Sequence, residues 1–325
     1  MKCLCHSFFI LSVLISCISC STPGIHKRAK EHNLKAVELI NKGNYEMAEK
    51  SLELALEYNK NYAEAYNNLG VIYLRQNKLE KAEEFFSVAI EYNGDFAEAH
   101  NNLGYVYLLQ GRINKAEQRF KSALNIDPAF ANARLNLSRL YILTNKYEEA
   151  ESQLKKLKLI SDNEEVFSLL VNIYIKMQKI NKAFELIDEM ISKKEYSTKG
   201  YYLRGFLNLT LNRCEDAISD FTSIEREYAN SIEFKTNLAA SYICNKNFEQ
   251  AKLILEKILS IQSDEPTALF NLGRIAYENK QYNEAEGYFE KSFRLGFGQA
   301  CPYLVDVLFK NGKKDESIRI SSSCK

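Results

Sequence analysis

The chain has 325 residues, of which 43 are basic and 42 acidic, and its formal net charge is +1. This balance leaves neither a basic field for nucleic acid nor an acidic tail, so nucleic acid is not an expected partner. Glycine and proline number only 13 and 4, too few for a fibrous or disordered chain. The composition therefore predicts a folded protein with a substantial hydrophobic core.

The first sixteen residues have the features of an export signal. Lys2 is the only charged residue, and the apolar run over residues 8–15 is shorter than the roughly 20 residues that a membrane-spanning helix needs. The run ends in LISC, which resembles the bacterial lipobox, in which the cysteine is acylated and becomes the first residue of the mature chain. The resemblance implies lipid attachment at Cys17. Cys20 is an alternative, and cleavage of an ordinary secretory signal stays open.

Residues 17–28 are then expected to form a lipidated tether ahead of the folded part. An acylated cysteine holds a protein at a membrane surface without spanning the bilayer. The resemblance to bacterial lipoproteins therefore implies a location in the cell envelope, on the periplasmic face.

A 34-residue pattern is repeated in full between residues 63 and 130. Each copy has a Leu-Gly pair, a tyrosine, an alanine, a phenylalanine and a second alanine at matching offsets: Leu69, Gly70, Tyr73, Ala82, Phe86 and Ala89, then Leu103, Gly104, Tyr107, Ala116, Phe120 and Ala123. The set resembles the tetratricopeptide repeat (TPR). The resemblance implies an all-α solenoid, a right-handed superhelix of antiparallel helix pairs that stack to bury their apolar faces.

The same pattern divides nearly all of the remaining chain into about eight full repeats and a truncated ninth that caps the array. The units are 29–62, 63–96, 97–130, 131–163, 164–197, 198–231, 232–265, 266–297 and 298 onward, and positions below count from the first residue of each unit. The fourth unit is one residue short, and Val171 occupies the small position eight of the fifth. We therefore expect a change of stacking angle between Leu154 and Val171, separating units 1–4 (residues 29–163) from units 5–8 and the cap (residues 164–325).

No residue pattern predicts catalysis, a cofactor, a metal ion or a small-molecule substrate. His100 falls at a core position of the third unit, and there is no phosphate-binding glycine loop. Pairs of acidic residues lie next to each other on exposed helix faces and do not oppose each other across a cleft. The chain is therefore not expected to be an enzyme.

Four cysteines of the C-terminal half are candidates for disulfides in an oxidising compartment. In an antiparallel hairpin, facing residues have repeat positions that add up to a constant. Cys301 at position four faces Cys324 at position 27 of the same unit. Cys214, at position 17 of the sixth unit, faces the end of the first helix of the seventh unit, where Cys244 lies. We predict the pairs Cys301–Cys324 and Cys214–Cys244, with four free thiols as the open alternative.

The first helices of the repeats are expected to line a concave groove. Asparagine recurs at position six, and its amide can pair with both the N–H and the C=O of an extended peptide. The row resembles the asparagine ladder of peptide-binding TPR superhelices. An alternative is that asparagine simply tolerates solvent there. The predicted peptide-binding residues are Asn68, Asn102, Asn136, Asn237 and Asn271, with Tyr105 and Arg139 beside them.

TPR arrays are binding scaffolds whose fold does not name the partner. A lipidated, exported array is similar to the pilotins of type IV pili, which implies an envelope assembly factor that binds an extended segment of an envelope protein. The other hypothesis is an adaptor that recruits peptidoglycan hydrolases or proteases in the envelope.

Overall fold

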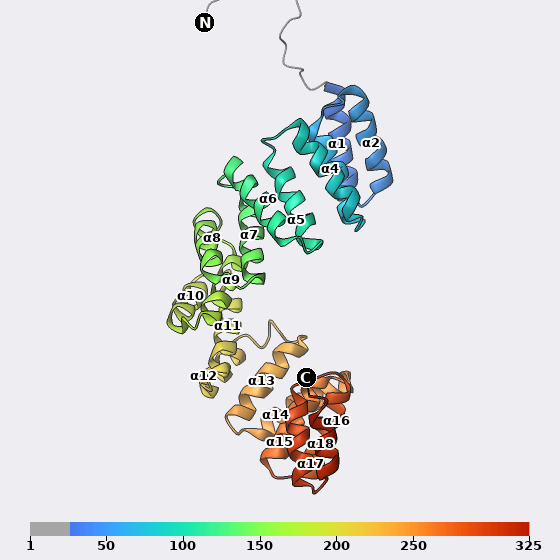
Figure 1. Cartoon of the computed structure of the whole chain (residues 1–325). Coiled ribbons are helices and arrows are strands. Elements are labelled where there is room, and N and C mark those ends of the chain that lie inside the picture. Colours follow the sequence, from blue (N-terminus) through green and yellow to red (C-terminus); the bar gives the residue numbers. More distant parts are fainter. Residues whose placement is uncertain (1–26, 325) are drawn as a thin grey trace, which may run out of the picture. The chain divides into compact units, whose positions relative to one another are not determined.

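We analysed the protein as a computed structural model, which describes residues 27–324. The sequence-based assignments to residues 1–26, including the signal, Cys17 and Cys20, lie outside this range. Within it every regular element is an α-helix, so the all-α prediction is confirmed (Figure 1). None of the helices in residues 27–324 combines the length and apolar character needed to cross a bilayer.

The chain divides into two compact units at Leu140 and Tyr141. Unit 1 contains six whole helices: α1 (Lys27–Asn41), α2 (Tyr45–Tyr58), α3 (Ala63–Arg75), α4 (Leu79–Tyr92), α5 (Ala97–Leu109) and α6 (Ile113–Ile126). The division falls inside α7 (Ala131–Leu143), whereas the sequence places a boundary between residues 163 and 164. That boundary stays a prediction.

Unit 2 contains the remaining eleven whole helices of the described chain, arranged like those of unit 1 as antiparallel pairs of consecutive helices. They are α8 (Tyr147–Ile160), α9 (Glu164–Lys176), α10 (Ile180–Ser192), α11 (Ser197–Thr210), α12 (Cys214–Ser223), α13 (Ile232–Cys244), α14 (Phe248–Ile261), α15 (Pro266–Glu278), α16 (Tyr282–Arg294), α17 (Ala300–Lys310) and α18 (Lys314–Ser321).

The two helices of a repeat pack through a pair of residues of complementary size. A Cβ atom added to Gly70 or Gly104 at position eight would lie 2.6 or 2.8 Å from the ring of Phe86 or Phe120, sixteen residues on. Full repeats with a larger residue at position eight have an aliphatic one sixteen residues later. Val171 is thus followed by Ile187, and both are buried. The fifth repeat therefore departs from the pattern at both positions together, which keeps its core filled.

The turn within each repeat is fixed by one residue with positive φ. This residue always occupies position fifteen, where the first helix ends in a left-handed cap. In the second repeat, for example, Asn77 has φ 57° and the N–H of Lys78 donates to the carbonyl of Tyr73 at 2.9 Å. The nine positions are Gly43, Asn77, Gly111, Asn145, Gln178, Asn212, Lys246, Lys280 and Gly312.

Candidate functional site

The asparagines at position six of unit 1 form hydrogen bonds to the repeat before them. The Nδ2 of Asn68 donates to the Oδ1 of Asn33 at 2.8 Å, and Asn102 donates to Asn67 at 3.0 Å. Asn136 donates to Asn101 at 2.9 Å. These three bonds, which we call the rungs, join α1 to α3, α3 to α5 and α5 to α7.

The acceptors of the rungs were not among the residues predicted from the sequence. They occupy position five, and the donor of each rung follows 35 residues later. The repeated Asn-Asn doublets at Asn67 and Asn101 are the signal that could have revealed them. Asn67 is only 2% exposed, so its oxygen depends on the rung for a partner.

The rungs leave part of each position-six amide available. One N–H of Asn68 and one of Asn136 is used, while no described residue donates to their Oδ1 atoms. Asn102 receives a longer contact of 3.5 Å from the Nδ2 of Asn101. The side chains are therefore held in fixed orientation and still offer an acceptor and a second donor to a ligand.

A hollow lies beside the rungs of the third and fourth repeats. Its volume is 530 Å³, and it opens between the starts of α5 and α7. Its walls combine aromatic rings, amides and carboxylates: Phe96, Ala97, Glu98, Asn101, Asn102, Asp127, Phe130 and Asn132. The hollow thus contains the central predicted asparagine, Asn102.

Apolar side chains continue the same helix faces beyond the hollow. Tyr105 and Leu109, which follow Asn102 at helical spacing on α5, are exposed, as is Leu34 on α1. Arg139 lies exposed on α7. Tyr105 and Arg139 therefore lie on the surface, where a peptide could reach them.

Unit 2 has one related hydrogen bond, with a tyrosine at position five. The Nδ2 of Asn237 donates to the hydroxyl oxygen of Tyr202 at 3.3 Å, and this hydroxyl donates to Glu233 at 2.9 Å. Burial and the carboxylate of Glu233 raise the pKa of Tyr202 to about 12. Tyr202 thus stays protonated and acts as both acceptor and donor in this pair of repeats.

Asn271 does not fit the predicted ladder. It is only 3% exposed, and the one hydrogen bond to its side chain within the described chain comes from Arg274 on the same helix, at 3.5 Å. Asn271 lies beside Phe270, which packs against Phe297 and Tyr303 of the following segment. The position that the sequence assigned to the open groove is therefore buried at this repeat.

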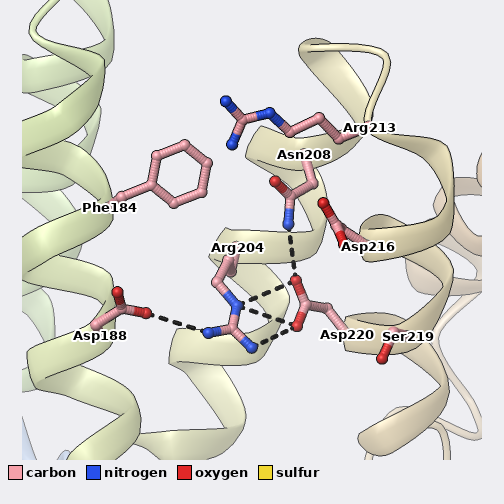
Figure 2. Close-up of a pocket in the computed structure, with 8 residues that line it drawn as sticks. All are labelled: Phe184, Asp188, Arg204, Asn208, Arg213, Asp216, Ser219 and Asp220. Carbon is pink, nitrogen blue, oxygen red and sulfur yellow. Dashed lines mark hydrogen bonds and ion pairs between the residues drawn. The ribbon is translucent and has the colours of Figure 1, made fainter.

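A second hollow, of 360 Å³, lies in unit 2 between α10, α11 and α12 (Figure 2). Arg204 lies at its centre. Its guanidinium binds Asp220 through Nε and Nη2, at 3.1 and 2.8 Å, and Asp188 through Nη1 at 3.1 Å. Asn208 donates to the second oxygen of Asp220 at 3.0 Å. Across the hollow, the guanidinium of Arg213 lies 5.2 Å from the ring centre of Phe184.

This polar network replaces the apolar contacts of the other repeats. Arg204 occupies position seven, where the neighbouring repeats have Leu170 and Leu238, and Asn208 occupies the position of Tyr174 and Tyr242. The shorter asparagine leaves room for the hollow. Because the arginine is engaged by two carboxylates of the chain itself, we assign the network to stability.

The structure joins Cys214 to Cys244 and Cys301 to Cys324, with Cα–Cα distances of 5.6 and 5.7 Å. Both distances are ordinary for disulfides. We expect mass spectrometry of non-reduced peptides, from protein produced in an oxidising compartment, to recover these two crosslinked pairs. Recovery of four thiols that react with an alkylating reagent would contradict the pairing.

His100 is buried in α5. Its Nε2 is 3.1 Å from the carbonyl oxygen of Gly94, and its Nδ1 is 3.4 Å from Nη1 of Arg119. Burial lowers the pKa of His100 and is the largest effect. The hydrogen bond to Gly94 partly opposes it, the nearby charge of Arg119 lowers the pKa further, and Asp95 has the smallest, opposing effect. The neutral imidazole, with the proton on Nε2, satisfies both contacts.

The lowered pKa of His100 makes the stability of the protein depend on pH. The unfolded chain binds the proton more tightly, so this contribution is complete above the unfolded pKa of about 6.5 and is lost as the pH falls below it. We expect the free energy of unfolding to decrease between pH 7 and 5. The variant His100→Tyr, which carries the residue of Tyr66 one repeat earlier, should lose this part of the slope. The free energy of unfolding of both proteins is measured by denaturant titration at several pH values. The same dependence on pH in the two proteins would disprove the assignment.

Family models described as tetratricopeptide repeat match residues 33–96, 85–118, 107–170 and 266–296. A model described as PPR repeat matches residues 165–194, within the fifth repeat. Among curated protein sequences, no significant match was found.

Two solved structures share the fold over a large part of the chain. PilF of Pseudomonas aeruginosa is 20% identical, with a TM-score of 0.55, and the match covers 65% of this chain and 97% of PilF. PilW, described as a widely conserved type IV pilus biogenesis factor, is 22% identical, with a TM-score of 0.56, and the match covers 65% of this chain and 99% of PilW. At these identities the likeness establishes a common architecture.

Proposed function

The chain belongs to the tetratricopeptide repeat family, and from this premise we propose that unit 1 binds an extended segment of a partner protein in its groove. The observation that carries the proposal is the row of rungs beside the 530 Å³ hollow. Oriented amides can pair with a peptide backbone whatever its side chains, and the hollow can take one side chain.

The surroundings of the rungs support a peptide as the ligand. Tyr105, Leu109 and Leu34 offer apolar contact next to the amides, which is the combination that binds alternate side chains of an extended segment. No group of three or more metal-ligating side chains is found in residues 27–324. A binding scaffold is therefore the function that the described geometry supports best.

For the setting, we propose the bacterial cell envelope, with lipid attachment at Cys17 holding the groove near a membrane on the periplasmic side. In this setting the protein would act as an assembly factor comparable to the pilus biogenesis factor PilW, whose fold it shares. The alternative is an adaptor that delivers peptidoglycan hydrolases or proteases to their substrates. The identity of the captured partner separates the two.

Replacing Asn68, Asn102 and Asn136 together by alanine tests the groove. Partners are captured from detergent-solubilised envelopes, and the bound segment is then made as a peptide and titrated. We expect the triple variant to bind at least roughly tenfold more weakly, which corresponds to about 1.4 kcal/mol, since each lost amide pair costs on the order of 1 kcal/mol. The rungs are lost as well, so the variant should also be less stable by about 1 kcal/mol per rung.

The control changes the opposite side of the repeat stack. Met47 and Leu54 are exposed apolar residues of α2, and their joint replacement by alanine should leave peptide affinity unchanged. Helix content must be measured for both proteins, because a partly unfolded variant would bind poorly for another reason. A peptide that binds the triple variant with full affinity, and the Met47 and Leu54 variant weakly, would place the site outside the groove.

A further inference from the structure

The hollow between α5 and α7 has two apolar walls. Phe96 and Phe130 are the residues directly before these helices, and both are partly buried. Ala97 adds a small apolar surface between them. Walls of this kind suit the methylene chain of a long side chain, which packs against rings while its polar end stays hydrated or paired.

The only charged side chains that line the hollow are negative. Glu98 and Asp127 are both exposed, and no basic residue of the described chain forms an ion pair with either. The basic residue of α7 nearest in sequence, Arg134, is only 7% exposed, and its guanidinium donates to the carbonyl of Pro128. The charged lining of the hollow is therefore negative, and no described basic side chain is paired with it.

Glu98 and Asp127 are carboxylates at positions 2 and 31 of the third repeat, and the two preceding repeats do not have a carboxylate at both positions. Asp127 occupies position 31, where the two preceding repeats have Asn59 and Asn93. All three side chains make the same local turn, in which Oδ1 accepts a backbone N–H two residues later, at 3.2, 3.2 and 2.9 Å. The turn needs only a side-chain oxygen, so the charge of Asp127 is not required for the fold.

The amides complete the set of acceptors. Asn101 is 7% exposed and is fixed by the rung from Asn136, and Asn102 lines the same hollow. Carboxylate and amide oxygens around an aromatic slot match the donors of an ammonium or guanidinium group. An acidic ligand group would be repelled, and a purely apolar one would bury these oxygens without partners.

We propose that this hollow receives a lysine or arginine side chain of the bound segment, with its stem between Phe96 and Phe130 and its charge beside Glu98 and Asp127. This inference rests on the proposed function of unit 1 and adds the chemical class of the ligand. It also fixes the register of the peptide, because the basic residue must lie level with Asn102.

A display library of random dodecapeptides, selected on the immobilised full-length chain, tests the inference. Peptides that bind the wild type and lose binding to the Asn68, Asn102 and Asn136 triple variant are taken as groove ligands. We expect lysine or arginine to be enriched at one position of these peptides. Replacing that residue by glutamine should weaken binding about tenfold, and raising the salt concentration should weaken binding of the basic form only.

The matching protein variant is Glu98→Gln with Asp127→Asn, which removes both charges and keeps the turn found at Asn93. It should bind the basic peptides about tenfold more weakly than the wild type. The control, Glu57→Gln with Glu91→Gln, removes two exposed charges on α2 and α4 and should bind normally.

The outcomes separate the two proposals. If groove ligands show no basic preference, or bind the Glu98 and Asp127 variant with unchanged affinity, the cation site is wrong while peptide binding at the asparagines stands. If no selected peptide depends on the asparagines, the groove proposal fails and the cation site fails with it.

Discussion

Replacing Asp220 by alanine is expected to lower the free energy of unfolding of unit 2 by roughly 3 kcal/mol, near the lower end of the range for breaking a buried ion pair. Asp220 is 4% exposed and accepts hydrogen bonds from Arg204 and Asn208. Its loss leaves the guanidinium and the amide without their main acceptor. Because the side chain of Arg204 is 30% exposed, water can replace part of the lost interaction.

Asp188 provides the matched control on the other side of the same arginine. It bonds to Arg204 at 3.1 Å, but its side chain is 62% exposed. The variant Asp188→Ala should therefore cost about 0–1 kcal/mol when both variants are compared with the wild type by urea titration. The double variant Arg204→Leu with Asp220→Leu, which restores apolar contacts at the position of Leu170 and Leu238, should be more stable than Asp220→Ala alone. A loss in Asp220→Ala as small as the one expected for Asp188→Ala would refute the network's assignment to stability.

Replacing Phe120 by alanine is expected to destabilise unit 1 by about 3–5 kcal/mol. Phe120 is fully buried, and its ring fills the space that Gly104 leaves where α5 crosses α6. Alanine would leave a cavity that neither helix can close, since Gly104 has no side chain to offer. Hydrogen exchange of α5 and α6 measures the effect without interference from unit 2.

Phe309 is the control for the loss of an aromatic side chain. It is exposed on α17, so Phe309→Ala should change stability by less than about 0.5 kcal/mol. Phe120→Ala should in addition weaken peptide binding, because α5 carries Asn101 and Asn102. A Phe120→Ala protein with normal exchange rates in α5 would show that the Gly-Phe pairs are not what holds the two helices together.

Most of the fold could be predicted from the sequence because each repeat places the same kinds of residue at the same packing positions. The alanines, the glycines at position eight and the turn at position fifteen recur at fixed spacing, and one period is enough to assign the helices. The compensation between the larger Val171 and the smaller Ile187 was missed, because it is visible only when position eight is compared with the residue sixteen positions later. Position eight alone suggested a disrupted repeat where the core is in fact filled.

The candidate site was predictable only in part. The row at Asn68, Asn102 and Asn136 was visible, yet its hydrogen bonds to position five were not, because they depend on how neighbouring repeats stack. Asn271 was assigned to the open groove although its side chain is only 3% exposed, because burial depends on neighbours that the pattern of a single repeat does not contain. The Arg204 network escaped notice although an arginine in place of leucine is a clear signal that a charged partner lies nearby.

The rungs also give unit 1 a mechanical property. Each one ties a repeat to its immediate neighbour through a bond on the groove side, so lengthening the stack strains the rungs in series, and each can open by itself. A ligand that contacts several repeats would add bonds between them and raise the tension at which neighbouring repeats separate.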